Sequence, residues 1–146
     1  VLTETPAILL YLAQTHPDAA LAPRDDAFAT AKLQAFNSYL CSTVHVAHSH
    51  GGRGYRWANN ESSFADMKSK VPETMTECFR LIEDDFLVGP WVMGEQFTIG
   101  DPYLLTISNW LERDQVDRSQ FPKVDAHAKR MLERPRTKAA WDEHFA

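Results

Sequence analysis

The chain has 146 residues, enough for one domain with a sizeable hydrophobic core that needs no disulfides to hold it. Hydrophobic residues make up 44% and charged residues 24%, which excludes a disordered or fibrous protein. Twenty acidic against fifteen basic residues give a net charge of −5, so nucleic acid is excluded as a main partner. Two cysteines, Cys41 and Cys78, are too few for a disulfide framework and favour a reducing, cytoplasmic location.

The longest uninterrupted apolar run covers residues 7–13. It is far shorter than the roughly twenty residues that span a bilayer, so no membrane is expected as a partner. The chain opens at Val1 without a signal-peptide pattern, and it starts within a helical pattern. We therefore expect that residues are missing before Val1.

The first expected element is a short helix. Thr5 suits the N-cap and Pro6 the first helical position, where a missing N–H costs nothing. A connector with several prolines follows and marks the best candidate domain boundary. The sequence therefore predicts a terminal helix in residues 1–16, a linker in residues 17–25 and an all-helical domain in residues 26–146.

Two long amphipathic helices are expected next, because apolar residues recur at steps of three and four. The first runs over about residues 26–50 and the second over about residues 63–87. At the start of the second helix, Ser63 and Asp66 have the spacing of a capping box. Pro72 falls inside this helix and should kink it.

Three shorter helices complete the predicted fold. One begins at residues 98–101 and is followed by a loop at residues 114–120. The last two cover about residues 122–133 and 135–145, because the residue before Pro135 is disfavoured in the α conformation. No segment has a convincing strand pattern, so the predicted class is all-α.

Three separated motifs stand out. They are Thr3-Glu4-Thr5-Pro6-Ala7-Ile8 followed by Tyr11-Leu12-Ala13, then Phe97-Thr98-Ile99-Gly100-Asp101, and finally Arg134-Pro135 before a short helix with Ala and Trp. In this order and at these distances they resemble the glutathione transferase family, most closely its bacterial, beta-like members. The resemblance covers essentially the whole chain.

This resemblance implies a glutathione transferase C-terminal helical bundle over residues 26–146. Residues 1–16 would be the last helix of an absent thioredoxin-like domain, joined by the linker 17–25. The family also implies glutathione as co-substrate, a small electrophile as second substrate, a homodimer and a role in detoxification. The thiol-activating Tyr, Ser or Cys would lie upstream of Val1, so the catalytic residue is unknown and the chain is expected to be inactive alone.

A carboxylate and a hydroxyl open the first expected helix. A helix N-terminus presents free N–H groups and a positive dipole to a carboxylate ligand, and Thr5 adds a hydroxyl donor. Glu4 can hold an adjacent ammonium group. Together they match the zwitterionic end of a γ-glutamyl group, and the resemblance assigns Glu4 and Thr5 to glutathione binding. The alternative is that Thr5 only caps the helix and Glu4 is a solvated acid.

A polar stripe at helical spacing runs along the helix at residues 26–50, through Gln34, Ser38, Cys41, His45 and His48. This face can line a cleft. In beta-like members a histidine on the corresponding helix approaches glutathione. Matching the segment from Ser38-Tyr39-Leu40 to Val44-His45 with that helix implies that His45 is a glutathione-binding and accessory catalytic residue. Its neutral imidazole can donate to a thiolate. The alternative is a solvated or buried structural histidine.

The same helix end offers soft ligands at zinc-like spacing, in Cys41, His45, His48 and His50. A cluster without a matching second pair fits no standard zinc site, so no metal is expected. The following segment, residues 51–57, mixes glycines, cations and aromatics. It either covers a substrate or forms an ordinary surface loop around Trp57.

Thr98 and Asp101 are expected to be structural rather than catalytic. Their side chains can accept hydrogen bonds from each other's backbone N–H groups and so fix the start of a buried helix.

Two functions remain open from the sequence. The first is a glutathione transferase-like enzyme that conjugates glutathione to a small electrophile. The second is a non-catalytic module of the same fold, used for oligomerisation or protein binding. Glu4, Thr5 and the polar stripe favour the enzyme, and the electrophile cannot be read from the chain.

Overall fold

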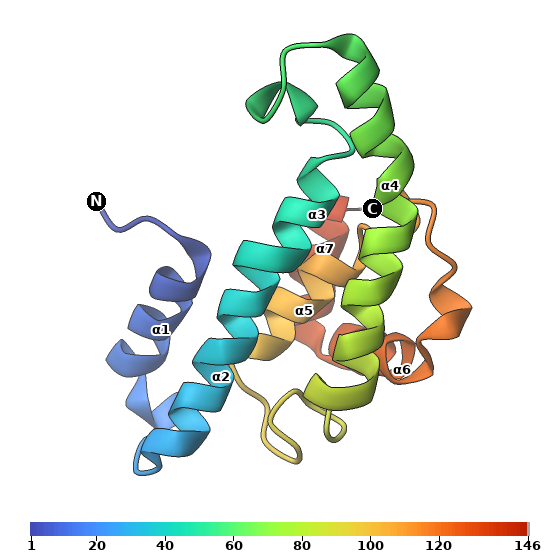
Figure 1. Ribbon diagram of the computed structural model, residues 1–146. Helices are drawn as coiled ribbons and strands as arrows, with labels where there is room; N and C mark the ends of the chain where they lie inside the picture. The colour runs from blue at the N-terminus through green and yellow to red at the C-terminus, as the bar shows by residue number, and fades with distance from the viewer. Residues whose placement is uncertain (146) are drawn as a thin grey trace.

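The fold consists of helices, as the sequence predicts (Figure 1). A computed structural model describes residues 1–145. Its seven α-helices in these residues are α1 (Thr5–Thr15), α2 (Ala27–Tyr39), α3 (His45–Ser49), α4 (Glu61–Leu81), α5 (Gly100–Ser108), α6 (Pro122–Glu133) and α7 (Pro135–Phe145). Extended pairing within 1–145 is limited to two isolated bridges at residues 91–96. None of the helices described has the length and apolar character needed to cross a bilayer.

The helices α2 and α3 form one continuous rod, which confirms the single helix predicted for residues 26–50. The Asp26 carboxylate caps its start by accepting from the N–H groups of Phe28 and Ala29, both at 2.9 Å. Between the two helices lies a π-helical turn, Leu40–Val44, closed by the His45 N–H donating to the Leu40 carbonyl five residues back.

The helix α4 continues into a second π-helical turn, Ile82–Phe86, which ends near the predicted residue 87. The predicted capping box of Ser63 and Asp66 is wrong. The helix begins two residues earlier, with Asn60 at the N-cap, and the Ser63 N–H donates to the Asn60 carbonyl at 3.0 Å. Ser63 therefore lies within the first turn, where it cannot act as the cap.

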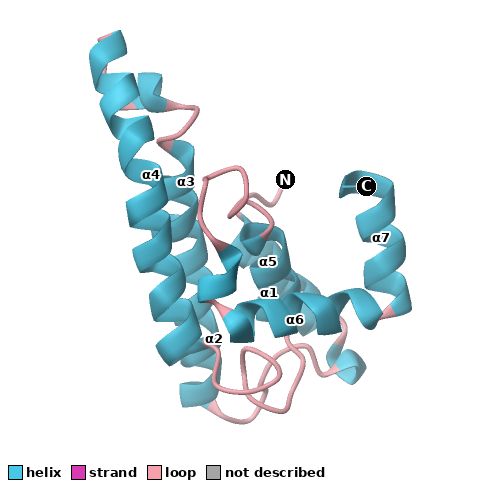
Figure 2. Cartoon of the chain, turned by 90° about the vertical axis from the view of Figure 1, so that its right-hand side faces the viewer, coloured by secondary structure: helices cyan, strands magenta, loops and turns pink. Residues whose placement is uncertain are grey.

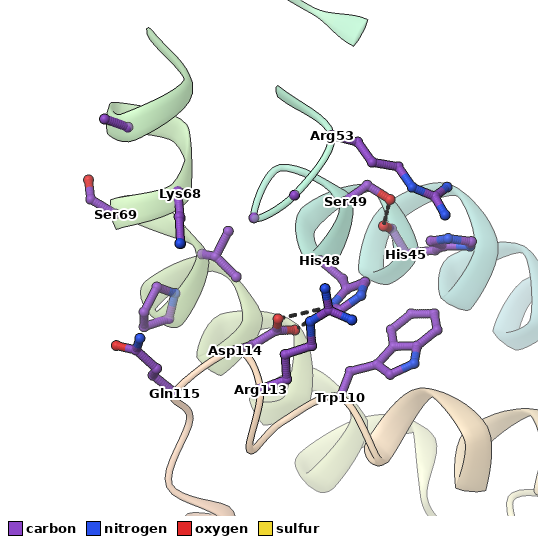
Figure 3. Close-up of a pocket in the computed structure, with 15 residues that line it drawn as sticks. His45, His48, Ser49, Arg53, Lys68, Ser69, Trp110, Arg113, Asp114 and Gln115 are labelled. Carbon is purple, nitrogen blue, oxygen red and sulfur yellow. Dashed lines mark hydrogen bonds and ion pairs between the residues drawn. The ribbon is translucent and has the colours of Figure 1, made fainter. Parts of the chain in front are cut away.

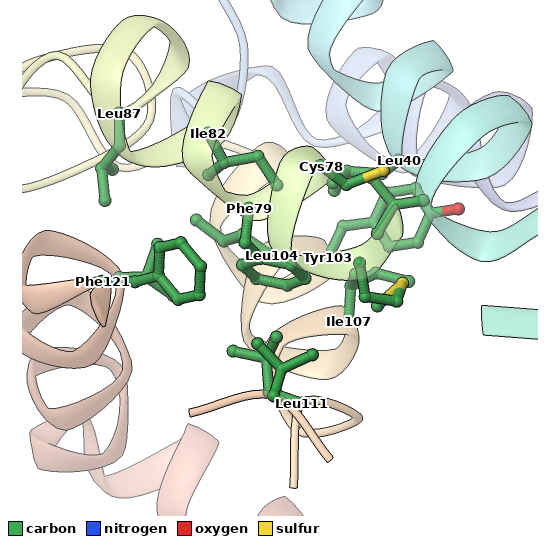
Figure 4. Packing of buried hydrophobic residues seen from close by; sticks show 14 of the residues in the cluster. Leu40, Cys78, Phe79, Ile82, Leu87, Tyr103, Leu104, Ile107, Leu111 and Phe121 are labelled. Carbon is green, nitrogen blue, oxygen red and sulfur yellow. The ribbon is translucent and has the colours of Figure 1, made fainter. Parts of the chain in front are cut away.

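The core forms where the rod α2–α3, the helix α4 and the helix α5 meet. In both views α4 runs beside α3, and the short α5 lies behind them in Figure 1 (Figures 1 and 2). Their inward side chains are almost fully buried and pack with residues from α6 (Figure 4). The largest fully buried side chains of this core cluster are Phe36, Leu40, Met75, Phe79, Ile82, Leu87, Leu104, Ile107, Leu111 and Phe121.

The helix α1 packs beside α2 through a small apolar cluster, in which Ala13 meets Leu33 and Ile99. The connector after α1 is tied to the loop before α5, because the Ile99 N–H donates to the Leu21 carbonyl at 2.9 Å. The other side of α1 carries exposed apolar side chains, including Ile8, Tyr11 and Leu12.

The start of α5 is organised by a buried carboxylate. Asp101 is fully buried, and its Oδ2 accepts from the Thr98 N–H at 2.6 Å. Its Oδ1 accepts from the Val92 N–H at 2.8 Å and lies 3.0 Å from Nε2 of the buried His127. The sequence predicts that the Thr98 hydroxyl accepts from the Asp101 N–H. It accepts instead from the Gly100 N–H, at 3.4 Å. Asp101 thus joins the loop before α5, α5 itself and α6.

We predict that Asp101→Ala lowers the free energy of unfolding by about 3–5 kcal/mol, because two backbone N–H groups and an imidazole lose their buried acceptor. Urea unfolding of the variant measures this loss. Asp84→Ala, at an exposed acid, serves as the control and should leave the midpoint of urea unfolding unchanged. A shift for Asp101→Ala no larger than that of the control would contradict the assignment.

Candidate functional site

The N-terminus of α1 is strained and uncapped. Glu4 occupies the N-cap with φ of 69° and ψ of 118°, a region that residues other than glycine rarely adopt, and its side chain makes no capping bond. The first helical bond runs from the Ile8 N–H to the Glu4 carbonyl at 3.0 Å. The predicted N-cap at Thr5 is therefore wrong by one residue. Strain of this kind gathers at ligand sites, and the first N–H groups stay free for a ligand.

Tyr103, in the first turn of α5, links the start of α1 to the rod. Burial raises the pKa of Tyr103 to about 12, the nearby Cys41 and Glu4 act in the same direction, and the nearby Thr5 side chain opposes them. These interactions bring Glu4, Thr5, Cys41 and Tyr103 into one region. Sequence reasoning did not single out Tyr103; the only available signal was a hydroxyl-bearing side chain among the apolar residues of this helix.

Further along the rod, two histidines face one tryptophan. The ring of His48 stacks on Trp110 with centroids 4.2 Å apart and an angle of 20° between the planes. His45 lies against the same indole at 5.1 Å. The Asp114 carboxylate holds His48, with Oδ2 2.7 Å from Nδ1 (Figure 3). Because Asp114 is buried, this contact fixes both the His48 ring and the turn after α5.

The electrostatic surroundings of His45 are positive. Burial lowers its imidazole pKa, and His48, Arg53 and Arg56 lower it further by charge repulsion. At neutral pH the imidazole is therefore held in its neutral form. A neutral ring can donate a hydrogen bond to an anionic sulfur from one nitrogen.

A pocket of about 980 Å³ opens beside these rings, between α3, α4 and the turn after α5 (Figure 3). His45, His48 and Trp110 line it together with charged side chains from all three segments. The charged residues are Arg53, Lys68, Arg113 and Asp114. Sequence reasoning missed the contributions of α4 and of the turn, because no spacing rule joins segments so far apart in the chain.

The predicted polar stripe does not form one continuous face toward this pocket. Of its five members only His45 and His48 line the pocket, whereas Ser38 is exposed and Cys41 packs against the core. The π-helical turn at residues 40–44 lies within the stripe and interrupts the regular helical spacing on which the prediction relied.

The residues weighed as zinc ligands point to different partners. His48 pairs with Asp114, and His50 packs on Trp57 at 4.4 Å between ring centroids. Across residues 1–145 no three His, Cys, Asp or Glu side chains come together as a metal-binding group. Thr98 and Asp101 lie away from the pocket, at the opposite end of α5 from Trp110.

A family model described as the C-terminal domain of glutathione S-transferase matches residues 55–135. This chain belongs to the glutathione S-transferase family. A solved glutathione transferase homologue from Sulfitobacter, with bound glutathione, is 45% identical and superposes with a TM-score of 0.94, over 99% of this chain and 69% of that one. A bacterial beta-class glutathione S-transferase from Sphingomonas chungbukensis is 30% identical, with a TM-score of 0.81 over 97% of this chain and 67% of its own.

Among curated proteins, the glutathione S-transferase GstA of Escherichia coli O157:H7 is 24% identical over 140 residues. The match takes in 96% of this chain and 66% of that relative, so the chain spans slightly less than two thirds of its length. The family resemblance read from the three sequence motifs is thereby confirmed.

We predict that the His45 ring titrates below the ordinary histidine value of about 6.5. A pH titration followed by NMR of the ring protons measures the midpoint. Arg53→Gln should raise the midpoint, because one of the charges that disfavours imidazolium is removed. Arg80→Gln, an exposed cation of α4 outside the pocket, is the matched control. A midpoint that is unchanged in Arg53→Gln would contradict this electrostatic assignment.

Proposed function

We propose that this chain takes part in a glutathione transferase reaction. In such a reaction the glutathione thiolate attacks an electrophilic carbon, a C–S bond forms, and the leaving group departs with its electron pair. The observation that carries the proposal is that Glu4 and Thr5, at the uncapped start of α1, lie close to Tyr103 and Cys41, and that His45 follows Cys41 by four residues along the rod. The glutathione bound to the Sulfitobacter homologue supports the same ligand.

The N-terminus of α1 would hold the γ-glutamyl end of glutathione. The Glu4 carboxylate is suited to the ligand's ammonium group. The Thr5 hydroxyl and the uncapped backbone N–H groups are suited to its carboxylate, which also gains from the positive end of the helix dipole. The positive φ of Glu4 sets the direction of the Glu4 side chain at the start of the helix. It costs local backbone strain, as is common at binding sites.

His45 would act as an accessory group on the sulfur. A hydrogen bond from its neutral imidazole favours the thiolate over the thiol and so lowers the thiol pKa. The pocket beside His45 would then receive the electrophile against the exposed part of Trp110. We assign the main activating residue to the rest of a thioredoxin-like domain whose last helix is residues 1–16, with residues 17–25 as linker and 26–146 as the helical domain.

The remaining features follow from the family. We propose a homodimeric, cytoplasmic enzyme that detoxifies small electrophiles. The exposed apolar side chains Ile8, Tyr11 and Leu12 on α1 support a further packing partner for that helix.

We predict that the 146-residue chain binds glutathione weakly, with a Kd near 1 mM or about −4 kcal/mol, since it offers contacts to only part of the ligand. NMR titration should perturb the amide signals of Glu4, Thr5 and the neighbours of His45. Thr5→Val should abolish these changes, because it keeps the shape and removes the hydroxyl, whereas Thr5→Ser should keep them. Glu4→Gln should weaken binding, and Glu95→Gln, at an exposed acid, should not. Perturbations confined to other residues would overturn this assignment.

A second prediction concerns the sulfur, in a longer protein where a thioredoxin-like domain precedes this chain. There His45→Ala should raise the pKa of the bound glutathione thiol, because a donor to the thiolate is lost. Turnover should fall about 10²-fold, the lower end of the range for general acid–base groups, with a smaller change in KM for glutathione. Thiolate absorbance against pH measures the pKa directly. An unshifted thiolate titration would remove His45 from the site.

A further inference from the structure

We propose that the pocket beside His45 selects co-substrates that combine an aromatic ring with an anionic group such as a carboxylate. The term co-substrate rests on the function proposed above, whereas the ligand class rests on the pocket alone. The pocket lies wholly within the described residues and so can be tested without glutathione.

The pocket is lined by more positive than negative side chains. Three segments each bring one cation to the pocket: Arg53 follows α3, Lys68 lies on α4, and Arg113 follows α5 (Figure 3). None of the three side chains forms an ion pair within residues 1–145. The one acid that lines the pocket, Asp114, has both oxygens within 2.9 Å of His48 Nδ1. All three cations are exposed side chains that line the pocket, and together they create a positive field that favours an anionic ligand.

The indole of Trp110 gives the pocket a flat aromatic surface. Trp110 is half-buried, and the stacked ring of His48 holds the indole in place from one side. Because the Asp114 carboxylate holds the His48 ring, which stacks on Trp110, neither ring loses further conformational freedom when a ligand binds. An aromatic ring of the ligand gains offset or edge contacts with such a surface. A volume of about 980 Å³ is ample for a substituted benzene ring and its charged group.

The surroundings of His45 point to the same kind of ligand. Burial lowers the His45 pKa, and His48, Arg53 and Arg56 lower it further by charge repulsion, so a further positive charge is disfavoured near this ring. The same field favours a negative charge at this place. A ligand whose ring rests on Trp110 and whose carboxylate meets Arg113 or Lys68 uses both properties at once.

The experiment compares two probes of nearly equal shape, 4-chloro-3-nitrobenzoate and the neutral 4-chloro-3-nitrobenzamide. Isothermal titration with the 146-residue chain, without glutathione, gives both affinities. We expect the acid to bind about tenfold more tightly than the amide, as for one charge-assisted hydrogen bond. Raising the salt concentration should weaken the acid alone, because salt screens exposed charges.

Variants locate the effect. Arg113→Gln and Lys68→Gln should each reduce the preference for the acid by about three- to fivefold. Arg80→Gln removes an exposed cation from the same helix as Lys68, outside the pocket, and should leave the preference unchanged. Trp110→Leu should weaken the acid and the amide alike, since it removes the ring surface and no charge. Thermal unfolding of each variant confirms that the fold is intact.

Equal affinity for acid and amide, or an equal effect of Arg113→Gln and Arg80→Gln, would overturn the proposal. Acetate binding as tightly as the aromatic acid would overturn its aromatic part. The glutathione titration fails or succeeds independently. A chain that prefers the aromatic acid but shows no glutathione contacts at Glu4 and Thr5 would support the ligand class and contradict the transferase function.

Discussion

The structure depends on one buried carboxylate. Asp101 has no exposed surface, and it accepts from the Thr98 and Val92 N–H groups while it pairs with the buried His127. A buried charge is tolerated only where its hydrogen bonds are satisfied, so the loop before α5 and the helix α6 must both meet α5 at this point. The position of α5 in the core follows from this requirement.

The two ends of α5 in turn define the candidate site. Tyr103, in its first turn, interacts with Thr5 at the start of α1. Trp110, just beyond its last turn, lies against both His45 and His48. A short helix that is held in the core therefore sets the distance between the region proposed to bind the γ-glutamyl end of glutathione and the region proposed to bind its sulfur and the second substrate. The rod α2–α3 completes the arrangement. Its π-helical turn lies between Cys41, which packs against the core, and His45, which lines the pocket.

Much of this fold follows from local patterns in the sequence. The period of the apolar residues gives the two long helices, and Pro122 and Pro135 give the starts of α6 and α7 at the predicted residues. The starts of α1 and α4 are less predictable, because Glu4 adopts a backbone conformation that its residue type rarely takes and Asn60 begins α4 without a side-chain cap. Local helix propensity predicts neither of these two helix starts, because both depend on packing around the helix ends.

The candidate site was predictable only in part. Glu4, Thr5 and His45 could be proposed from the motif order, but the position of Glu4 and Thr5 near Tyr103 depends on how α1 packs against the rest of the fold. The pairs His48–Asp114 and Asp101–His127 join residues 66 and 26 positions apart, and no helical or strand period connects such distances. Likewise, the charge of the pocket arises because three segments meet, although the chain as a whole is acidic.

The central claim is that one glutathione molecule spans from the start of α1 to His45. Intermolecular nuclear Overhauser effects between glutathione and the isotope-labelled 146-residue chain test it most directly. The account predicts contacts from the γ-glutamyl methylene protons to Thr5 and from the cysteinyl methylene protons to the His45 ring, in the same complex. Contacts of the cysteinyl protons with residues remote from His45, while the γ-glutamyl group stays at Thr5, would contradict it.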